Sequence, residues 1–160
     1  MKRTTTFSFL IASAMLLGVF ASCTKDNSPV EPPMTPSQIL SSTAWETTSG
    51  RDAEGKTLPI TDPNVTNFVG FAYFKSDSTF TMYNLDDSPK MHGDWWLSED
   101  GKTRTIVAKD NNGTVLFTRV VDMVVLTTKE FTYRVYPDAT NKAVYYDIIH
   151  TPTNHPEPTK

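Results

Sequence analysis

The sequence predicts an all-β domain in which antiparallel strands form an up-and-down meander and close into a barrel of about eight strands. Three observations predict this fold. Helical periodicity is nearly absent between residues 37 and 150, where apolar and polar residues alternate in short runs. Turns rich in Asp, Asn, Ser, Gly and Pro interrupt these runs, so consecutive strands are joined by tight hairpins. A meander of this length can close on itself, which leaves no unpaired edge strand.

Each strand is placed by its alternation and by the turn residues that follow it. The predicted strands, in chain order, cover Ala44–Arg51, Phe68–Lys75, Thr79–Leu85, Met91–Leu97, Thr103–Lys109, Thr114–Leu126, Phe131–Tyr136 and Ala143–His150. The segment SQILSS, residues 37–42, is expected to form one short helical turn. A two-sheet sandwich is the alternative. A Greek-key sandwich needs long crossing connections, however, and only residues 52–67 are long enough to provide one.

Composition restricts the function classes. Apolar residues make up 38% and charged residues 21% of the 160 residues, which is enough apolar material for the core of one domain. The formal net charge is −3, and it becomes −5 if Lys2 and Arg3 are removed with a signal peptide. Nucleic acid is not an expected partner, because phosphate recognition needs clustered Lys and Arg. The single cysteine, Cys23, excludes an internal disulfide and a zinc site built on thiolates.

The first 22 residues have the three parts of a secretory signal peptide. Two basic residues are followed by an uncharged apolar run at residues 7–20 and by two small residues directly before Cys23. The run of about 14 residues is too short to span a bilayer, which needs ~20. The junction resembles the lipobox of bacterial lipoproteins, with Phe20 where leucine is usual. This resemblance implies cleavage before Cys23 and attachment of acyl chains such as palmitate to it. An ordinary signal peptide with a free thiol is the alternative.

The residues after Cys23 extend this interpretation. The stretch CTKDNS is similar to the export signal of surface lipoproteins in the Bacteroides group, so display on the cell surface is a hypothesis. Residues 24–36 hold four prolines and little that can pack, and such a segment reaches roughly 40 Å when extended. We therefore expect an envelope protein that is anchored to the outer membrane through Cys23.

The sequence thus divides into four predicted parts. These are a lipoprotein signal peptide at 1–22, the lipidated Cys23 with its Pro-rich tether at 23–36, a β-barrel domain at 37–150, and an unpacked tail at 151–160.

Several stretches carry a family resemblance. STAWETTSG, FAYFKSDSTFTMY, GDWWLSEDGKTRTI and LTTKEFTYRV resemble the small lipocalin-like lipoproteins of gut Bacteroidetes, and EFTYRVYPD with YYDIIHTP resembles a bacterial family known only as a domain of unknown function. The likeness covers most of residues 40–152 and implies a calycin-type barrel without a known activity. Two residues depart from the lipocalin pattern. Thr43 stands where lipocalins have a glycine two residues before their tryptophan. Arg134 is only a weak counterpart of the arginine that packs on this tryptophan in lipocalins.

Alternation also assigns the two faces of the strands. Across the turn SDS, Phe74 should pair with Phe80 and point inward together with Ala72 and Met82. In GDWWL, Trp95 should point inward. The same alternation turns four aromatic residues outward as candidate ligand- or partner-binding residues: Phe71, Tyr73, Tyr83 and Trp96. Two alternatives stay open, namely that residues 52–67 fold across this surface and bury it, or that a bulge reverses the assignment.

The sequence contains no recognisable catalytic motif. His150 and His155 are expected to be solvated tail residues rather than metal ligands, and a bulge or kink should turn Asp122 to water. No nucleophile–base set and no Gly-rich phosphate loop are present. We therefore expect no enzyme activity, no cofactor and no metal. The predicted function is a binding module for a small apolar ligand or glycan, and the alternative is a subunit that docks on an envelope complex through the outer aromatic residues.

Overall fold

The computed structural model describes residues 32–159. The predicted signal peptide, Cys23 and the greater part of the tether lie outside the described residues. None of the helices in the described part of the chain is long and apolar enough to cross a membrane.

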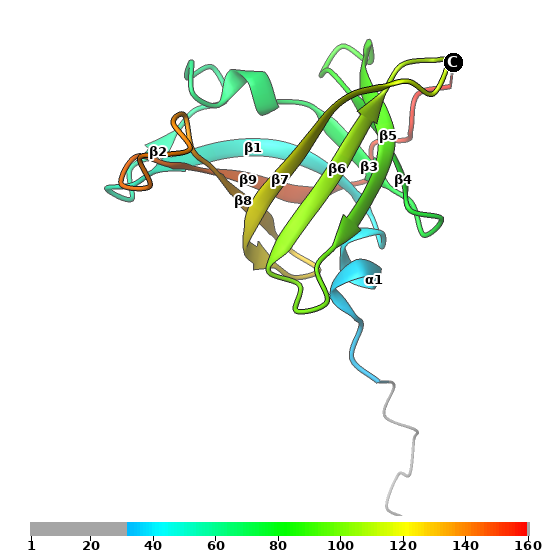
Figure 1. Ribbon diagram of the computed structural model, residues 1–160, viewed down its shortest axis with the longest axis horizontal. Helices are drawn as coiled ribbons and strands as arrows, with labels where there is room; N and C mark the ends of the chain where they lie inside the picture. Colours follow the sequence, from blue (N-terminus) through cyan, green and yellow to red (C-terminus); the bar gives the residue numbers. More distant parts are fainter. Residues whose placement is uncertain (1–31, 160) are drawn as a thin grey trace, which may run out of the picture. The chain divides into compact units, whose positions relative to one another are not determined.

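The described chain forms a closed antiparallel β-barrel (Figure 1). Its elements are α1 (Pro36–Leu40), β1 (Ala44–Asp52), β2 (Thr57–Leu58), a 3₁₀ helix (Thr66–Phe68), β3 (Phe71–Phe74), β4 (Thr79–Tyr83), β5 (Pro89–Leu97), β6 (Thr103–Lys109), β7 (Val115–Leu126), β8 (Phe131–Val135) and β9 (Tyr146–Thr153). The strand order is β2-β1-β3-β4-β5-β6-β7-β8-β9, and an additional pairing of β1 with β9 closes the sheet. Eight strands therefore form the barrel, and the short β2 pairs beside the end of β1. The predicted all-β meander and its closure are confirmed.

Most of the predicted strands coincide with observed ones. Residues 103–109 form β6 as predicted, and α1 is the expected helical turn. The strand predicted from Phe68 begins only at Phe71, because residues 66–68 form the 3₁₀ helix instead. The prediction missed β2, which consists of only two residues.

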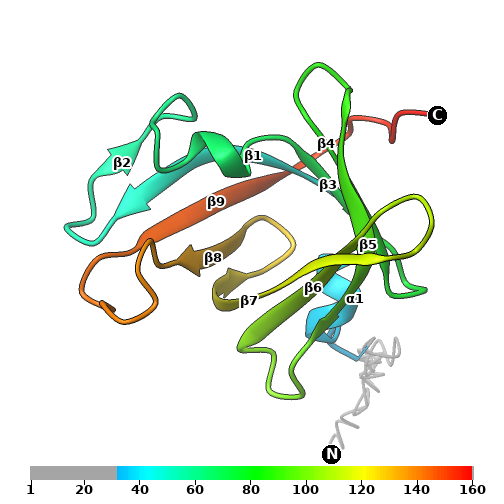
Figure 2. The same cartoon turned by 45° about the horizontal axis from the view of Figure 1, so that its top comes forward.

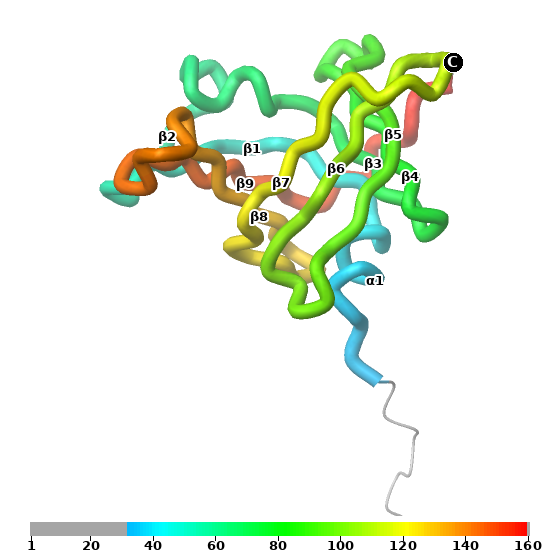
Figure 3. The backbone as a smooth tube through the Cα atoms, in the orientation of Figure 1, coloured from blue at the N-terminus to red at the C-terminus, as the bar shows by residue number. Residues whose placement is uncertain are grey.

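The C-terminal boundary of the domain was predicted incorrectly. The last strand was expected at residues 143–150 and an unpacked tail at 151–160, but β9 runs from Tyr146 to Thr153 and pairs along its whole length with β1. The tube in Figure 3 follows this end of the chain along β1. The prolines misled the prediction: Pro152 needs no amide hydrogen to lie opposite Trp45 at the end of the strand.

The helix α1 lies at one end of the barrel (Figure 1). Thr35 and Gln38 form a capping box, in which each side chain bonds the backbone N–H of the other residue, and Pro36 occupies the first turn. Leu40 is fully buried, and the indole Nε1–H of Trp45 donates a hydrogen bond to its carbonyl oxygen at 2.9 Å. This contact attaches the short helix to the aromatic core.

Pairing along one edge of β1 is interrupted. At its start β1 pairs with β3 through residues 44–46, and near its end it pairs with β2 through residues 50–51. Between them, the segment that contains the 3₁₀ helix passes over the barrel (Figure 2). Gly70 ends this segment with φ 146, and a Cβ there would lie 2.2 Å from the Tyr83 carbonyl oxygen. This interruption forms one wall of the site described below.

Candidate functional site

The assignment of inner and outer faces is confirmed in the β3–β4 hairpin and in β5. Phe74 pairs with Phe80, and both lie in the main core together with Ala72 and Trp95. Phe71, Tyr73 and Tyr83 form a separate cluster on the outer face, in which the rings of Tyr73 and Tyr83 lie 5.9 Å apart. Trp96 points outward and is 49% exposed.

The outer cluster of Phe71, Tyr73 and Tyr83 is buried, however, and the C-terminal segment covers it. The ring of His155 stacks on Phe71 with their centroids 3.9 Å apart. The Tyr73 hydroxyl lies 2.8 Å from Nδ1 of His155, and the Tyr83 hydroxyl donates to the Pro158 carbonyl oxygen at 3.2 Å.

Charged groups hold this covering segment. Lys75 Nζ lies 3.0 Å from Glu157 Oε1, and the Thr81 hydroxyl donates to the same carboxylate. His155 Nε2 lies 3.3 Å from a carboxylate oxygen of Asp87. Burial, together with the nearby charges of Asp87 and Glu157, raises the pKa of Tyr73 to about 12.

The predicted exposed patch is therefore wrong for three of its four residues. An alternative held that the chain itself buries this surface, and this is what is found, but residues 155–158 do so rather than residues 52–67. His155 is correspondingly a packed residue and not the solvated tail residue expected. Only Trp96 remains exposed, and binding of a ligand or partner by these residues stays a prediction.

The barrel interior is filled mostly by its own side chains. Phe74 lies at its centre, with ring centroids 5.3 Å from Trp95 and 5.9 Å from Phe131, and Phe131 in turn lies 5.7 Å from Trp45. A cavity of about 20 Å³ remains between residues 67–72 and inward-facing side chains of β4 to β9. Such a volume has room for one water molecule or a group of similar size.

Arg104 is the most unusual residue of this interior. It is 1% exposed and lies within the aromatic core, with its guanidinium carbon 4.5 Å from the ring centroid of Tyr133, 5.1 Å from that of Phe131 and 5.4 Å from that of Phe74. Its Nε and Nη1 atoms have no hydrogen-bond partner within residues 32–159. Burial lowers the pKa of Arg104, and the nearby Tyr133 opposes this effect.

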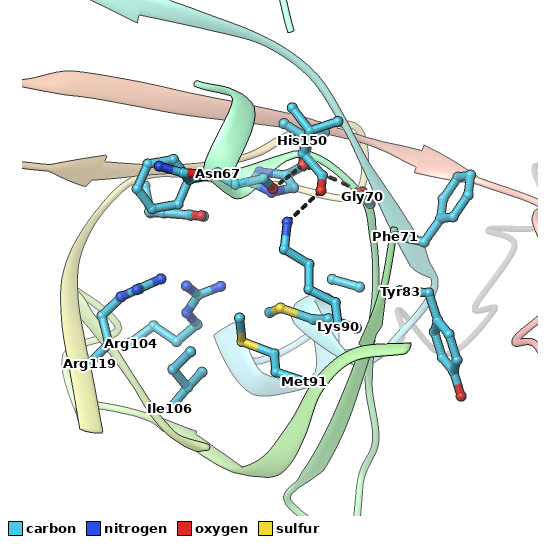
Figure 4. Close-up of a pocket in the computed structure, with 16 residues that line it drawn as sticks. Asn67, Gly70, Phe71, Tyr83, Lys90, Met91, Arg104, Ile106, Arg119 and His150 are labelled. Carbon is cyan, nitrogen blue, oxygen red and sulfur yellow. Dashed lines mark hydrogen bonds between the residues drawn. The ribbon is translucent and has the colours of Figure 1, made fainter. Parts of the chain in front are cut away.

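Two further cationic side chains line the same cavity. Figure 4 shows Arg119 and Lys90 pointing toward the space that Arg104 borders. Lys90 Nζ donates to the Val69 carbonyl oxygen at 2.6 Å, and burial together with the charge of Arg119 lowers its pKa. No Asp or Glu is among the described residues that line this cavity.

His150 also lines the cavity but carries no charge near neutral pH. Its ring stacks on Phe131 and Tyr133, and Nδ1 lies 3.2 Å from the Phe131 carbonyl oxygen. Burial, together with the positive charge of Arg104, lowers its pKa to about 3. The expectation of a solvated tail residue was wrong, because β9 carries His150 into the core.

Two open hollows of about 380 Å³ each adjoin the cavity by sharing side chains with it. One hollow shares Phe68 and Arg119 with the cavity and lies beside β7 and β8. The other shares Met82, Lys90 and Met91 with it, and its remaining lining includes two apolar residues of β7: Leu116 and Phe117. Space that is open to solvent therefore lies next to the small cavity.

Asp122, the other candidate for unusual chemistry, is exposed as predicted. It accepts a hydrogen bond from the Tyr136 hydroxyl at 3.0 Å. The bulge in β7 lies between Met123 and Val125, so simple alternation, rather than a kink at Asp122, turns the side chain outward. Among the described residues, no group of three or more His, Cys, Asp or Glu side chains is placed to hold a metal ion.

Arg104 was not predicted as a site residue, although the sequence contains a signal for it. In TRTIVAK, Arg104 alternates with Ile106 and Ala108, and both of these are buried. Alternation alone therefore places the guanidinium inside the barrel. The arginine weighed as the lipocalin counterpart, Arg134, instead forms a two-point pair with Asp147 at 2.7 and 3.1 Å.

Comparison with known proteins gives a family for this barrel. Residues 37–159 match a family described as Domain of unknown function (DUF4822). The chain belongs to the DUF4822 family. The predicted resemblance to a family known only as a domain of unknown function is confirmed. No curated protein matches the chain.

Solved structures similar to this DUF4822 chain include a lipocalin-like protein and two amine-binding proteins. A lipocalin-like protein from Bacteroides uniformis matches with TM-score 0.48 and 15% identity, over 72% of this chain and 99% of that one. The amine-binding protein of Rhodnius prolixus, in complex with tryptamine, has TM-score 0.41 and 18% identity, over 74% and 64%. A biogenic amine-binding protein has TM-score 0.40 and 16% identity, over 74% and 65%.

The covering segment should contribute measurably to the stability of the DUF4822 domain. Replacing His155 by Ala removes its stacking on Phe71 and its contact with Tyr73, which should lower the free energy of unfolding by roughly 1–2 kcal/mol in a urea titration. The neighbouring exposed residue provides a matched control, because Asn154→Ala should change stability by less than about 0.5 kcal/mol. Equal effects of the two substitutions would contradict a structural role for the segment.

His150 should make the DUF4822 domain sensitive to acid. The native state leaves His150 unprotonated down to about pH 3, whereas the unfolded chain takes up the proton near pH 6.5, so stability should fall as the pH drops between these values. The loss attributable to this residue is on the order of a few kcal/mol. In His150→Phe, urea unfolding should therefore depend less steeply on pH from 6.5 to 4. Parallel curves for the two proteins would show that His150 does not cause the loss.

Proposed function

We propose that this DUF4822 protein is a non-catalytic binding module that takes a small ligand at the cavity bordered by Arg104, and that acyl chains on Cys23 hold it at the outer membrane. The observation that carries the ligand proposal is a buried guanidinium with unpartnered N–H groups beside a cavity that adjoins two open hollows. A buried polar group without a partner costs stability, so its retention in a well-packed core suggests a role in binding.

The lining of the cavity favours a ligand that is at least partly apolar over a glycan. Met82, Met91 and Ile106 offer a sugar no strong hydrogen bonds, and the cavity of about 20 Å³ is too small for a sugar ring. Catalysis finds little support in the same residues. His150 lines the cavity with a pKa of about 3, which makes it a poor general base near neutral pH.

Docking on an envelope complex is the second candidate, and one observation favours it. Trp96 of β5 and Val120 of β7 lie on either side of Thr105 of β6, which is itself buried, across three paired strands. Trp96 is 49% exposed and Val120 is 61% exposed. Exposed apolar side chains that lie close together on one face are typical of protein contacts.

Native mass spectrometry of the protein extracted from its own cells in mild detergent separates the two candidates. The binding proposal predicts a retained small molecule in the native protein and in Trp96→Ala, because Trp96 does not line the cavity. A protein partner that accompanies the native chain but not Trp96→Ala, with no small molecule on either, would replace ligand binding by docking.

The anchor is tested independently. Cys23→Ser should leave the signal uncleaved or release the mature protein from membranes, because the acyl chains have no attachment site without the thiol. The measurement is an immunoblot of membrane and soluble fractions. A substituted protein that still fractionates with membranes at the mature size would overturn the proposed anchor.

A further inference from the structure

The charges inside the barrel are all of one sign, and this sign indicates the chemistry of a ligand. Arg104 cannot lose its proton under ordinary conditions, so its burial leaves a full positive charge in the core. Its three aromatic neighbours stabilise that charge through their ring faces. The rings provide no strong acceptor for the N–H groups of Nε and Nη1, which remain unpartnered among residues 32–159.

The other groups around the cavity increase the positive charge instead of compensating it. Arg119 and Lys90 border the same space, whereas His150 is neutral near pH 7. None of the carboxylates in the described chain lines this cavity. Such an environment attracts an anion, which would gain charge-assisted hydrogen bonds in a site with little water.

Size restricts the anion. The cavity of about 20 Å³ has room for little more than a water molecule, so only a small head group can enter it and a sugar ring cannot. The adjoining hollow of about 380 Å³ is large enough for the rest of a small ligand. Its side chains include Met82, Met91, Leu116 and Phe117, which favour an apolar chain there.

We propose that the ligand is a monocarboxylic acid with an apolar chain, whose carboxylate lies against Arg104 in the cavity and whose chain lies in the hollow beside β4 and β5. This inference rests on the proposed binding function and adds the chemical class of the ligand. Arg119 and Lys90, at the border between the cavity and the hollows, attract the carboxylate as it enters.

Isothermal titration calorimetry on the full chain in a neutral detergent tests the head group. Sodium hexanoate should bind, whereas hexan-1-ol and hexylammonium, which have the same chain without the negative charge, should bind at least about tenfold more weakly. Sodium acetate and sodium chloride serve as free anions without a chain, and neither should displace hexanoate at an equal concentration.

Each other outcome overturns a defined part of the proposal. Equal binding of hexan-1-ol and hexanoate would refute the carboxylate and leave the barrel as a binding module for apolar ligands. Displacement by equal acetate or chloride would refute the apolar chain and leave a small-anion site. If hexanoate does not bind while native mass spectrometry finds a retained molecule, this inference fails alone. If neither experiment finds a ligand, the proposed function fails as well.

Variants of Arg104 separate binding from packing. Arg104→Met keeps much of the side-chain volume without the charge, and it should weaken hexanoate binding at least about tenfold. It should also raise the unfolding temperature, because a buried charge without a partner is removed. Arg51→Met is the matched control, since Arg51 lies on β1 and does not line the cavity.

If Arg104 had only a structural role, its substitution would not produce weaker binding together with higher stability. Unchanged hexanoate affinity in Arg104→Met would overturn the proposal. If that variant does not fold, Arg119→Met takes its place, because Arg119 is only half-buried and borders the same cavity. This second substitution should also lower hexanoate affinity, and an affinity equal to that of the unsubstituted chain would overturn the proposal.

Discussion

The pairing of β1 with β9 is the interaction on which the rest of the structure depends. It joins the first and last strands of the barrel through eight residue pairs, from Ala44 with Thr153 to Asp52 with Tyr146. Both strands would otherwise present open edges, and the core would be exposed between them. Because β1 pairs with β9 along its whole length but with β3 only at its start, the barrel closes on one side of β1 and stays interrupted on the other. The small cavity lies under that interruption.

The same closing strand positions the cover of the outer aromatic cluster. After Thr153 the chain leaves β1 and crosses the outer face of β3 and β4, where His155 stacks on Phe71. Three hydrophobic side chains that would otherwise be exposed are thereby buried without another domain or subunit. The ion pair between Lys75 and Glu157 lies at the edge of this contact and is partly exposed, so it contributes less to stability than the aromatic packing does.

Arg104 shows how a strand pattern can place a charge inside a packed core. Its neighbours in the strand, Ile106 and Ala108, are also buried, so the pleat of β6 turns the guanidinium into the barrel. Aromatic rings reduce the cost of burying its charge but do not satisfy its N–H groups. Burial lowers the pKa of His150, and the charge of Arg104 lowers it further, because a second cation beside Arg104 would be costly. The chemistry of this interior therefore depends on one residue that the strand pattern forces inward.

The sequence alone determined the strands, the hairpins and the side toward which most residues point. Alternation and turn chemistry act over a few residues, so β6, the pairing of Phe74 with Phe80, and the opposite orientations of Trp95 and Trp96 could all be predicted. Only the tertiary structure decided what lies against each face. Alternation indicates that Phe71 points outward but not that His155 covers it, and it places Arg104 inside without showing whether a carboxylate meets it there. Such contacts join residues far apart in the chain, and they exist only after β1 and β9 have paired.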